Sequence, residues 1–150
     1  MTLKEIAKTI DHAVLKPDFT DTDLEQHAKM CMEFGVFSMC VKPCDIKSAK
    51  KLLSGSDVKV SCVLSFPHGA DATSVKIFQA KQAIGDGTDE IDMVMNIGKF
   101  LSGDYNYVLE DIRAVVDVAH SQGVLVKVIQ EIGFLTPEQV AKACELSYEA

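Results

Sequence analysis

Two charged residues stand in the middle of segments that are otherwise mostly apolar. Asp92 lies within residues 90–95 and Lys127 lies within residues 124–129, and both segments are rich in aliphatic side chains. A charge inside an apolar segment is costly unless it is paired, so we expect the carboxylate and the ammonium to meet. Desolvation would lower the pKa of the lysine towards that of a nucleophilic amine, whereas a neighbouring carboxylate would keep it charged. The pair is therefore either a structural ion pair or a pair that carries out chemistry.

Other segments hold residues that could also take part in chemistry. Asp11 and His12 stand together near the end of a short apolar run, and their role is left open by the sequence. His68 belongs to the loop Phe-Pro-His-Gly, where a lone histidine is more often a turn or packing residue than an acid or base. Cys40 is more often a core thiol than a pocket thiol in such a run. Cys40 and Cys44 lack the second ligand pair of a structural zinc site, so we expect no metal.

The segments that would position these residues are short, apolar and β-branched. Four of them indicate strands buried on both faces, as in a parallel sheet, and a weaker run precedes them. They span residues 35–41, 58–64, 90–95 and 124–129, after the weaker run at 9–15. The charged residues singled out above therefore fall on predicted strands.

Amphipathic segments between the runs indicate helices. Thr22 and Glu25 have the spacing of a capping box, and Gly35 stands where the helix that follows would stop. Residues 104–120 carry a continuous apolar stripe at helical spacing. Residues 136–139, Thr-Pro-Glu-Gln, combine a cap, a first-turn proline and a capping-box glutamine, which is typical of a helix start.

The resulting order is five βα units behind a short helix at residues 3–8, in one domain over residues 1–150. This order indicates parallel strands joined by right-handed helical crossovers. An open doubly wound sheet and a part of a (βα)₈ barrel both fit it. In either architecture, ligands bind at the carboxyl ends of the strands. Neither a G-x-G-x-x-G segment nor a P-loop is present, so nucleotide binding is not indicated.

Composition excludes several classes of protein. The net charge of −7 argues against a nucleic-acid partner, because phosphate binding depends on clustered Lys and Arg. No apolar run approaches the roughly 20 residues that span a bilayer. The first residues lack the continuous apolar region of a secretory signal, and the odd number of cysteines, 5, indicates reduced thiols. We therefore expect a cytoplasmic protein with no membrane partner.

Five segments occur in an order that resembles one family. They are Ile-Asp-His-Ala-Val-Leu-Lys-Pro at 10–17, Cys-Val-Lys-Pro at 40–43, Ser-Phe-Pro-His-Gly at 65–69, Glu-Ile-Asp-Met-Val-Met-Asn-Ile-Gly at 90–98 and Lys-Val-Ile-Gln-Glu at 127–131. Together they closely resemble deoxyribose-phosphate aldolase, a class I aldolase on a (βα)₈ barrel. The resemblance covers the whole chain and implies an incomplete TIM barrel made of the first five βα units.

The resemblance also implies a reaction and roles for individual residues. The family cleaves 2-deoxy-D-ribose 5-phosphate to glyceraldehyde 3-phosphate and acetaldehyde through a lysine Schiff base, whose protonated imine is the electron sink. No metal or organic cofactor is implied. Asp92 matches an aspartate of the proton relay, and Lys127 matches a lysine that sets the electrostatics of the pocket. Asp11 matches an acidic residue near the sugar hydroxyls, and Cys40 matches a pocket cysteine that reacts with aldehydes in some members.

One part of the family pattern is expected to lie outside the sequence. The Schiff-base lysine of the family stands on a sixth strand, in a Val-Lys-Thr-Ser-Thr-Gly-like motif that would begin a few residues after Ala150. The phosphate-binding loops after the seventh and eighth strands would also lie there. Lys127 could then act only as a substitute nucleophile, so the resemblance leaves open whether these residues alone form an active enzyme.

The incomplete barrel leads to an expectation about partners. Five strands cannot close an eight-stranded barrel, so the first and fifth strands should be open edges. We expect the chain to form a homo-oligomer through these edges and to act on a small aldehyde or a sugar phosphate. A non-catalytic barrel fragment that self-associates or assembles with another chain is the alternative. A different phosphosugar-binding α/β enzyme that uses Asp92 and Lys127 for proton transfer is a third, weaker interpretation.

Overall fold

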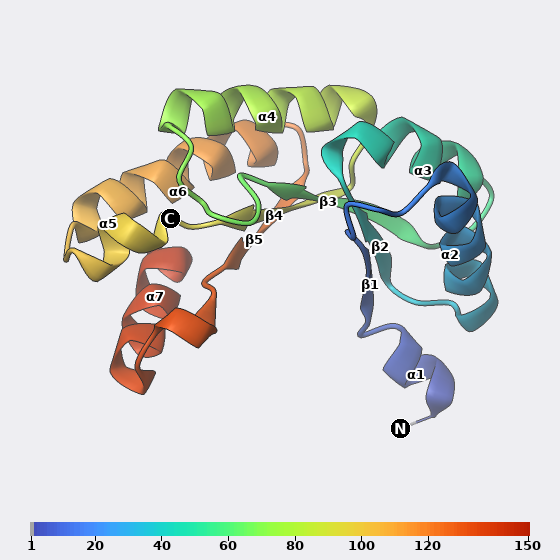
Figure 1. The fold of residues 1–150 in the computed structure, drawn as a ribbon, viewed down its shortest axis with the longest axis horizontal. Coiled ribbons are helices and arrows are strands. Elements are labelled where there is room, and N and C mark those ends of the chain that lie inside the picture. Colours follow the sequence, from blue (N-terminus) through green and yellow to red (C-terminus); the bar gives the residue numbers. More distant parts are fainter. Residues whose placement is uncertain (1) are drawn as a thin grey trace.

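The computed structural model describes residues 2–150 and contains a five-stranded sheet in which all neighbouring strands are parallel (Figure 1). The strands follow chain order across the sheet: β1 (Asp11–Val14), β2 (Ser38–Val41), β3 (Lys59–Leu64), β4 (Glu90–Val94) and β5 (Leu125–Ile129). The helices are α1 (Leu3–Ala7), α2 (Asp21–Phe34), α3 (Ile46–Leu52), α4 (Thr73–Asp86), α5 (Ile97–Leu101), α6 (Tyr105–His120) and α7 (Pro137–Glu149), with 3₁₀ turns η1 (Pro43–Asp45) and η2 (Ile132–Phe134). The prediction of five parallel βα units behind a short helix is confirmed.

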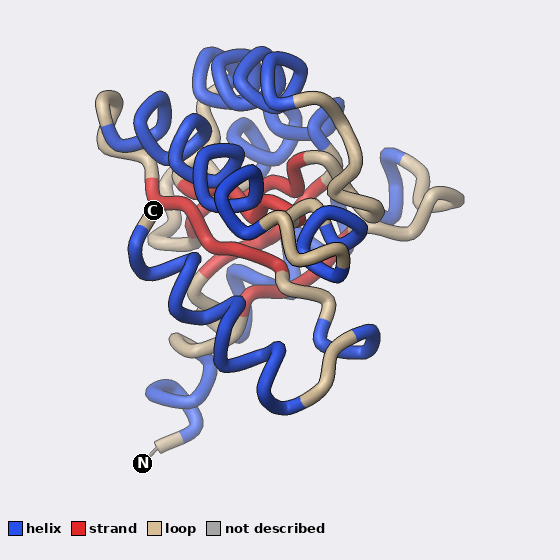
Figure 2. The backbone as a smooth tube through the Cα atoms, turned by 90° about the vertical axis from the view of Figure 1, so that its left-hand side faces the viewer, coloured by secondary structure: helices blue, strands red, loops and turns tan. Residues whose placement is uncertain are grey.

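The sheet is strongly curved. Neighbouring strands lie about 4.8 Å apart, so β1 and β5 would be about 19 Å apart in a flat sheet. Instead, Nζ of Lys127 on β5 lies 2.7 Å from Oδ2 of Asp11 on β1. Helices α2, α3, α4 and α6 lie along the convex side of the sheet, and α1 and α7 lie at the two ends of the arch (Figures 1 and 2). The architecture is therefore a partial barrel and not an open doubly wound sheet.

Alternate residues of the strands meet two different environments. The set that packs with the helices in the main hydrophobic core is apolar: Met39, Val41, Val60, Cys62, Leu64, Ile91 and Met93. The residues between them point to the concave side, because side chains alternate along a strand, and they include Asp11, Ser38, Ser61, Glu90, Asp92 and Lys127. The core thus holds the sheet from its convex side, and the polar groups are left to the interior of the barrel.

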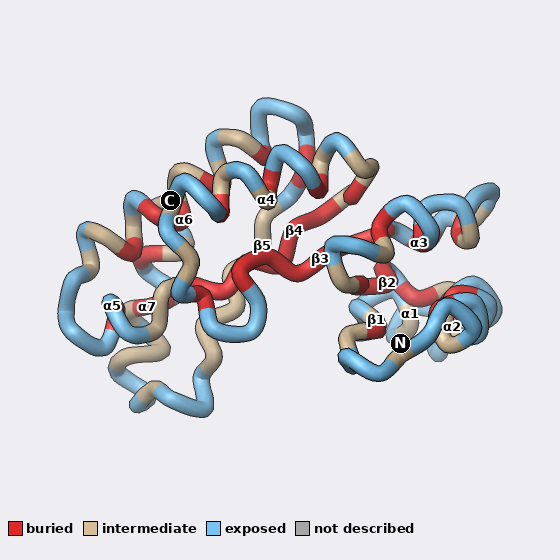
Figure 3. Tube along the Cα trace, turned by 45° about the horizontal axis from the view of Figure 1, so that its top comes forward, coloured by how far each residue is buried: buried red, intermediate tan, exposed pale blue. Residues whose placement is uncertain are grey.

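Burial of the strands falls from the centre of the sheet to its edges. Every residue of β2 and β4 is buried, as are those of β3 after Lys59 (Figure 3). In β5, by contrast, Leu125 is 49% exposed and the other residues are only partly buried. The prediction of burial on both faces is therefore wrong for this strand, because an edge strand has a neighbouring strand on one side only. The prediction that the first and fifth strands are edges is confirmed.

The helix starts follow capping chemistry. Helix α7 begins with the predicted capping box, in which Thr136 and Gln139 exchange side-chain and backbone hydrogen bonds. Helix α2 begins two residues earlier than predicted, because Thr20 and Asp23 form a complete capping box upstream of Thr22. Gly35 ends α2 in the left-handed region, as predicted. Within residues 2–150, no helix combines the length and the apolar composition needed to cross a lipid bilayer.

Two contacts fix the carboxyl end of β4. Lys76 of α4 is fully buried, and its Nζ donates to the carbonyl oxygen of Val94 at 3.1 Å and lies 2.6 Å from Oδ2 of Asp111 on α6. Gly69, in the loop after β3, has φ +65°, and a Cβ on it would overlap the carbonyl oxygen of Met95. The end of β4 is therefore held by α4, α6 and the loop after β3.

Candidate active site

The ammonium group of Lys127 lies on the concave face of the sheet, where three carboxylates surround it. Its Nζ is 2.7 Å from Oδ2 of Asp11, 3.0 Å from Oδ1 of Asp92 and 3.1 Å from Oε2 of Glu90. An ammonium group has three N–H donors, so each carboxylate can face one of them. Within residues 2–150, the facing oxygens of Glu90 and Asp92 are buried and have no hydrogen-bond partner, so they meet Lys127 as ion pairs. The expected contact of Asp92 with Lys127 is thus part of a larger cluster.

Three strands bring these four groups together. Asp92 and Lys127 are register partners on β4 and β5, and Glu90 precedes Asp92 by two residues on the same face. Asp11 is the first residue of β1 and reaches the cluster only because the sheet is curved. The side chains of Glu90 and Asp92 are 7% and 13% exposed, whereas those of Lys127 and Asp11 are 34% and 38% exposed. A ligand could therefore reach the cluster from the side of the edge strands.

The carboxylates determine the charge of the lysine. Burial acts to lower the pKa of Lys127, but its hydrogen bond to Asp11 and its ion pair with Asp92 outweigh burial and raise that pKa above its usual value. Burial acts to raise the pKa of Asp11, but the hydrogen bonds from Lys127 and Ser38 outweigh it and lower that pKa. Lys127 is therefore a cation at neutral pH and not a free amine. The alternative in which desolvation makes it nucleophilic does not fit this geometry.

Cys40 lies on the concave wall of the cluster and is also buried. Its Sγ is 3.3 Å from Oδ2 of Asp92, and the residue is 4% exposed. Burial raises the pKa of the Cys40 thiol to about 12, and the charge of Asp92 adds to this effect. The thiol is therefore protonated at neutral pH and serves as a weak hydrogen-bond donor to the carboxylate.

Two buried serines connect the carboxylates on the side away from Lys127. Ser38 donates from Oγ to Oδ1 of Asp11 at 2.6 Å. Ser61 lies 3.4 Å from Oγ of Ser38 and donates to Oδ2 of Asp92 at 3.5 Å. Both serines are fully buried. A continuous path of polar side chains therefore runs from β1 through β2 and β3 to β4.

The sequence prediction missed Glu90, Ser38 and Ser61. Strand alternation places Glu90 on the face of Asp92, and the same rule applied to β2 places Ser38 on the face of Cys40. The rule that ligands bind at the carboxyl ends of parallel strands does not select these three residues. The polar groups of the cluster extend to the amino ends of the strands, because Asp11, Ser38 and Glu90 are each the first residue of their strand.

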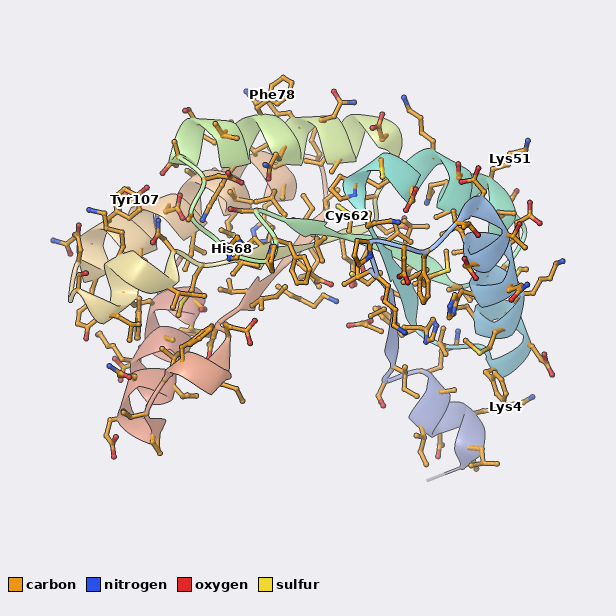
Figure 4. All side chains as sticks on the ribbon, in the orientation of Figure 1. Lys4, Lys51, Cys62, His68, Phe78 and Tyr107 are labelled. Carbon is orange, nitrogen blue, oxygen red and sulfur yellow. The ribbon has the colours of Figure 1, made fainter. Side chains whose placement is uncertain are left out.

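Other candidate residues lie outside the cluster. His68 is exposed on the loop after β3, whereas Cys62 lies in the sheet (Figure 4). Asn96 caps α5 by accepting a hydrogen bond from the backbone N–H of Lys99. His12 is directed towards α2, where its Nε2 lies 2.9 Å from Nδ1 of His27. His12 and Asn96 therefore have local structural contacts, and His68 is an exposed residue of a loop.

The donor set does not indicate a metal site. Within the described part of the chain, no group of three or more His, Cys, Asp and Glu side chains has the geometry to hold a metal ion. The cluster has three carboxylates and one ammonium group instead, a combination that can hold polar substrate groups and exchange protons with them.

Comparisons with known proteins give the family and the fold of the chain. Residues 5–149 match the family model described as DeoC/LacD family aldolase. The deoxyribose-phosphate aldolase of Thermococcus gammatolerans is 49% identical over 97% of this chain and 66% of that protein. The solved structure of QR15, an aldolase, has a TM-score of 0.91 and 34% identity over 97% of this chain and 64% of the other.

A more distant structure shows the fold alone. It is the tetrameric deoxyribose phosphate aldolase of Aeropyrum pernix, with a TM-score of 0.89 and 24% identity over 99% of this chain and 62% of the other. The chain spans about two thirds of the length of the curated relatives it matches. Its five βα units therefore correspond to a part of each related barrel.

Proposed function

Because the chain belongs to the DeoC/LacD family of aldolases, we propose that its polar cluster forms part of a site that cleaves 2-deoxy-D-ribose 5-phosphate to glyceraldehyde 3-phosphate and acetaldehyde. The observation that carries the proposal is the convergence of Asp11, Asp92 and Lys127 on the concave face of a partial barrel. These are the residues that the resemblance assigns to the pocket. The names of the matched relatives support the same substrate class.

The geometry suggests what each group does in this proposal. Asp92 has one oxygen towards Lys127 and the other towards the Cys40 thiol, so it is oriented to pass a proton to or from a substrate hydroxyl. Asp11, which is more exposed, is placed to accept hydrogen bonds from sugar hydroxyls. Lys127 supplies a fixed positive charge that lowers the pKa of Asp11 and holds the two carboxylates close together.

The imine-forming amine is proposed to come from outside residues 1–150. Lys127 donates a hydrogen bond to Asp11, pairs with Glu90 and Asp92, and is held as an ammonium ion, which has no lone pair for attack on a carbonyl. Lys76 is also unsuited, because it is fully buried between α4 and α6 and paired with Asp111. A lysine of a sixth strand, which the resemblance places beside β5, would face the exposed side of the cluster.

The proposal is tested by supplying the part of a related protein that residues 1–150 do not cover. The 150-residue chain is mixed with a polypeptide made of the part of the Thermococcus gammatolerans relative that it does not cover, and assembly is followed by gel filtration. Acetaldehyde release from 2-deoxy-D-ribose 5-phosphate measures turnover, and borohydride reduction followed by mass spectrometry locates an imine. We expect turnover by the assembled pair and a trapped lysine on the added polypeptide. An assembled pair that shows neither turnover nor a trapped imine rejects the proposed function.

A matched pair of variants tests the part played by the cluster. Asp92→Asn removes the proton-exchanging carboxylate and should lower turnover of the assembled pair about 100-fold or more. Asp117→Asn makes the same change on the exposed surface of α6 and should leave turnover unchanged. Equal turnover for the two variants would remove Asp92 from the mechanism. Turnover by the 150-residue chain alone would keep the aldolase function and reject the external lysine.

The open edges are proposed to associate with further polypeptide, either the rest of the barrel or a second copy of this chain. On the β5 side, Leu125, Ile132 and Phe134 are 49%, 64% and 66% exposed. Large apolar side chains beside an unpaired strand edge favour association. Sedimentation velocity over a hundredfold concentration range measures it. A monomer at every concentration would exclude self-association through the edges.

A further inference from the structure

The polar cluster contains two groups that neither the resemblance nor the mechanism above uses. They are the hydroxyls of Ser38 and Ser61, which lie behind the carboxylates as seen from Lys127. The interior of a (βα)₈ barrel is usually filled by branched aliphatic side chains. A small polar residue fills that space poorly and must also satisfy its hydroxyl. The two serines therefore need an explanation beyond packing.

The hydrogen positions of the two serines follow from a count of donors. Ser38 has one hydroxyl hydrogen, and the contact of 2.6 Å with Oδ1 of Asp11 is a charge-assisted hydrogen bond that uses it. Ser38 must then be the acceptor in its 3.4 Å contact with Ser61. The single hydrogen of Ser61 is therefore directed between Oγ of Ser38 and Oδ2 of Asp92, which is 3.5 Å away. Ser61 thus shares its one hydrogen between Ser38 and Asp92, and Ser38 gives its own hydrogen to Asp11.

Burial makes these hydrogen bonds hard to replace. Both serines are fully buried, so water cannot take over the donor position if a hydroxyl is removed. Register also fixes their place, because Ser38 is the partner of Asp11 across β1 and β2, and Ser61 is the partner of Cys40 across β2 and β3. The serines thus reach the carboxylates from strands that carry no charged group of the cluster.

We propose that Ser38 and Ser61 are positioning residues of the site, whose hydroxyls hold Asp11 and Asp92 in the orientations that face Lys127. Neither serine is proposed to touch the substrate, and each acts through a carboxylate. The proposal rests on the proposed function for its catalytic meaning. The contacts between the serine hydroxyls and the two carboxylates lie within the 150-residue chain, so their effect can be measured in that chain alone.

The test follows the titration of Asp11 by carbon-13 NMR of its side-chain carboxyl group in the 150-residue chain. Ser38→Ala removes the direct donor and should raise the midpoint of Asp11 by about one pH unit. Ser61→Ala weakens the donor only through Ser38, so a smaller rise of a few tenths of a unit is expected. Thr88→Val is the control, because its buried hydroxyl donates to the backbone carbonyl oxygens of Val60 and Glu90 and not to Asp11, and it should leave the midpoint unchanged.

A second pair of variants separates hydroxyl chemistry from small size. Ser38→Thr keeps the hydroxyl and adds a methyl group, whereas Ser38→Ala keeps the small size and removes the hydroxyl. The proposal expects the threonine variant to titrate like the parent chain and the alanine variant to shift, with folding of both checked by circular dichroism. The proposal is overturned if the Ser38→Ala variant folds and its Asp11 midpoint equals that of the parent chain. It is also overturned if Ser38→Ala, Ser61→Ala and Thr88→Val all shift the Asp11 midpoint by the same amount.

This result is independent of the test of function. A shifted titration together with an inactive assembled pair would keep the positioning role and reject the aldolase function. If the assembled pair is active but the Asp11 midpoint is unchanged in both serine variants, the aldolase function is kept and the positioning role is rejected. In an active pair, Ser38→Ala should also move the acid limb of the pH–rate profile upward by the same interval as the NMR midpoint, whereas a merely structural loss would lower the rate at every pH.

Discussion

Replacement of Lys127 by methionine removes the positive charge that three carboxylates share. Methionine has nearly the length and flexibility of the lysine stem, so the main change is electrostatic. Breaking a buried ion pair costs about 3–5 kcal/mol, but Lys127 is 34% exposed, and solvent screening reduces the expected loss to about 2 kcal/mol at pH 7. Glu90 and Asp92 are left facing each other, with few donors and little access to water.

The pH dependence of this loss has a definite sign. In the folded parent chain the pKa of Asp11 is lowered, so its stabilising contribution is present above the unfolded-state value near 4 and is lost as pH falls through the lower folded value. The pKa of Lys127 is raised, so its contribution is present below the unfolded-state value and is lost only as pH rises through the higher folded value. The cluster therefore stabilises the chain fully between about pH 4 and 10.

The assay is urea denaturation of the parent chain and the Lys127→Met variant at pH 7 and pH 3.5. The difference between the two chains should be about 2 kcal/mol at pH 7 and smaller at pH 3.5, because the contribution of Asp11 begins to be lost as pH falls below its unfolded-state value. Lys50→Met is the control, since Lys50 forms a more exposed pair with Asp89 and its loss should cost below about 1 kcal/mol. A loss that is equal at both pH values, or no loss at all, would refute the electrostatic account.

Three further changes have expected outcomes. Gly69→Ala should destabilise the chain by about 2 kcal/mol or more in urea, because φ is +65° and the new methyl group would overlap the Met95 carbonyl; a loss below about 0.5 kcal/mol would show that the loop moves freely. Lys76→Met alone should cost about 3–5 kcal/mol because it leaves Asp111 buried without its partner, whereas Lys76→Met with Asp111→Leu should recover most of that loss, and equal losses would contradict this. Cys40 should resist iodoacetamide at pH 7.5 in the folded chain and react in urea, as read by mass spectrometry, because burial keeps its thiol protonated; labelling at the rate of a free cysteine would contradict the buried site.

Much of the fold followed from periodicity, and the exceptions have physical reasons. The run at residues 124–129 looks as apolar as that of a central strand, but β5 lies at an edge of the sheet, and burial there depends on a neighbour that local sequence cannot reveal. The start of α2 was placed at Thr22 because Thr20 and Thr22 carry nearly the same signal, and only the exchange of hydrogen bonds with Asp23 decides between them.

The site was predictable to the extent that it depends on strand neighbours. Asp92 and Lys127 stand on consecutive strands, and alternation places both on one face, so their meeting could be expected before the structure was known. Glu90 follows from the same rule. Alternation also places Ser38 on the face of Cys40, but its contact with Asp11, 27 residues away, could not be derived from the sequence.

The contact between Asp11 and Lys127 is different in kind, because it depends on the shape of the whole sheet. The two residues are 116 positions apart and lie on opposite edges. In an open doubly wound sheet, about 19 Å would separate their strands, and each charge would need another partner or exposure to water. In a curved sheet the same two residues neutralise each other across the barrel interior. The ion pair is therefore a consequence of curvature and also favours it, since flattening the sheet would separate a cation from the carboxylate nearest to it. The choice between the two architectures, which the order of strands and helices left open, is decided by this one contact.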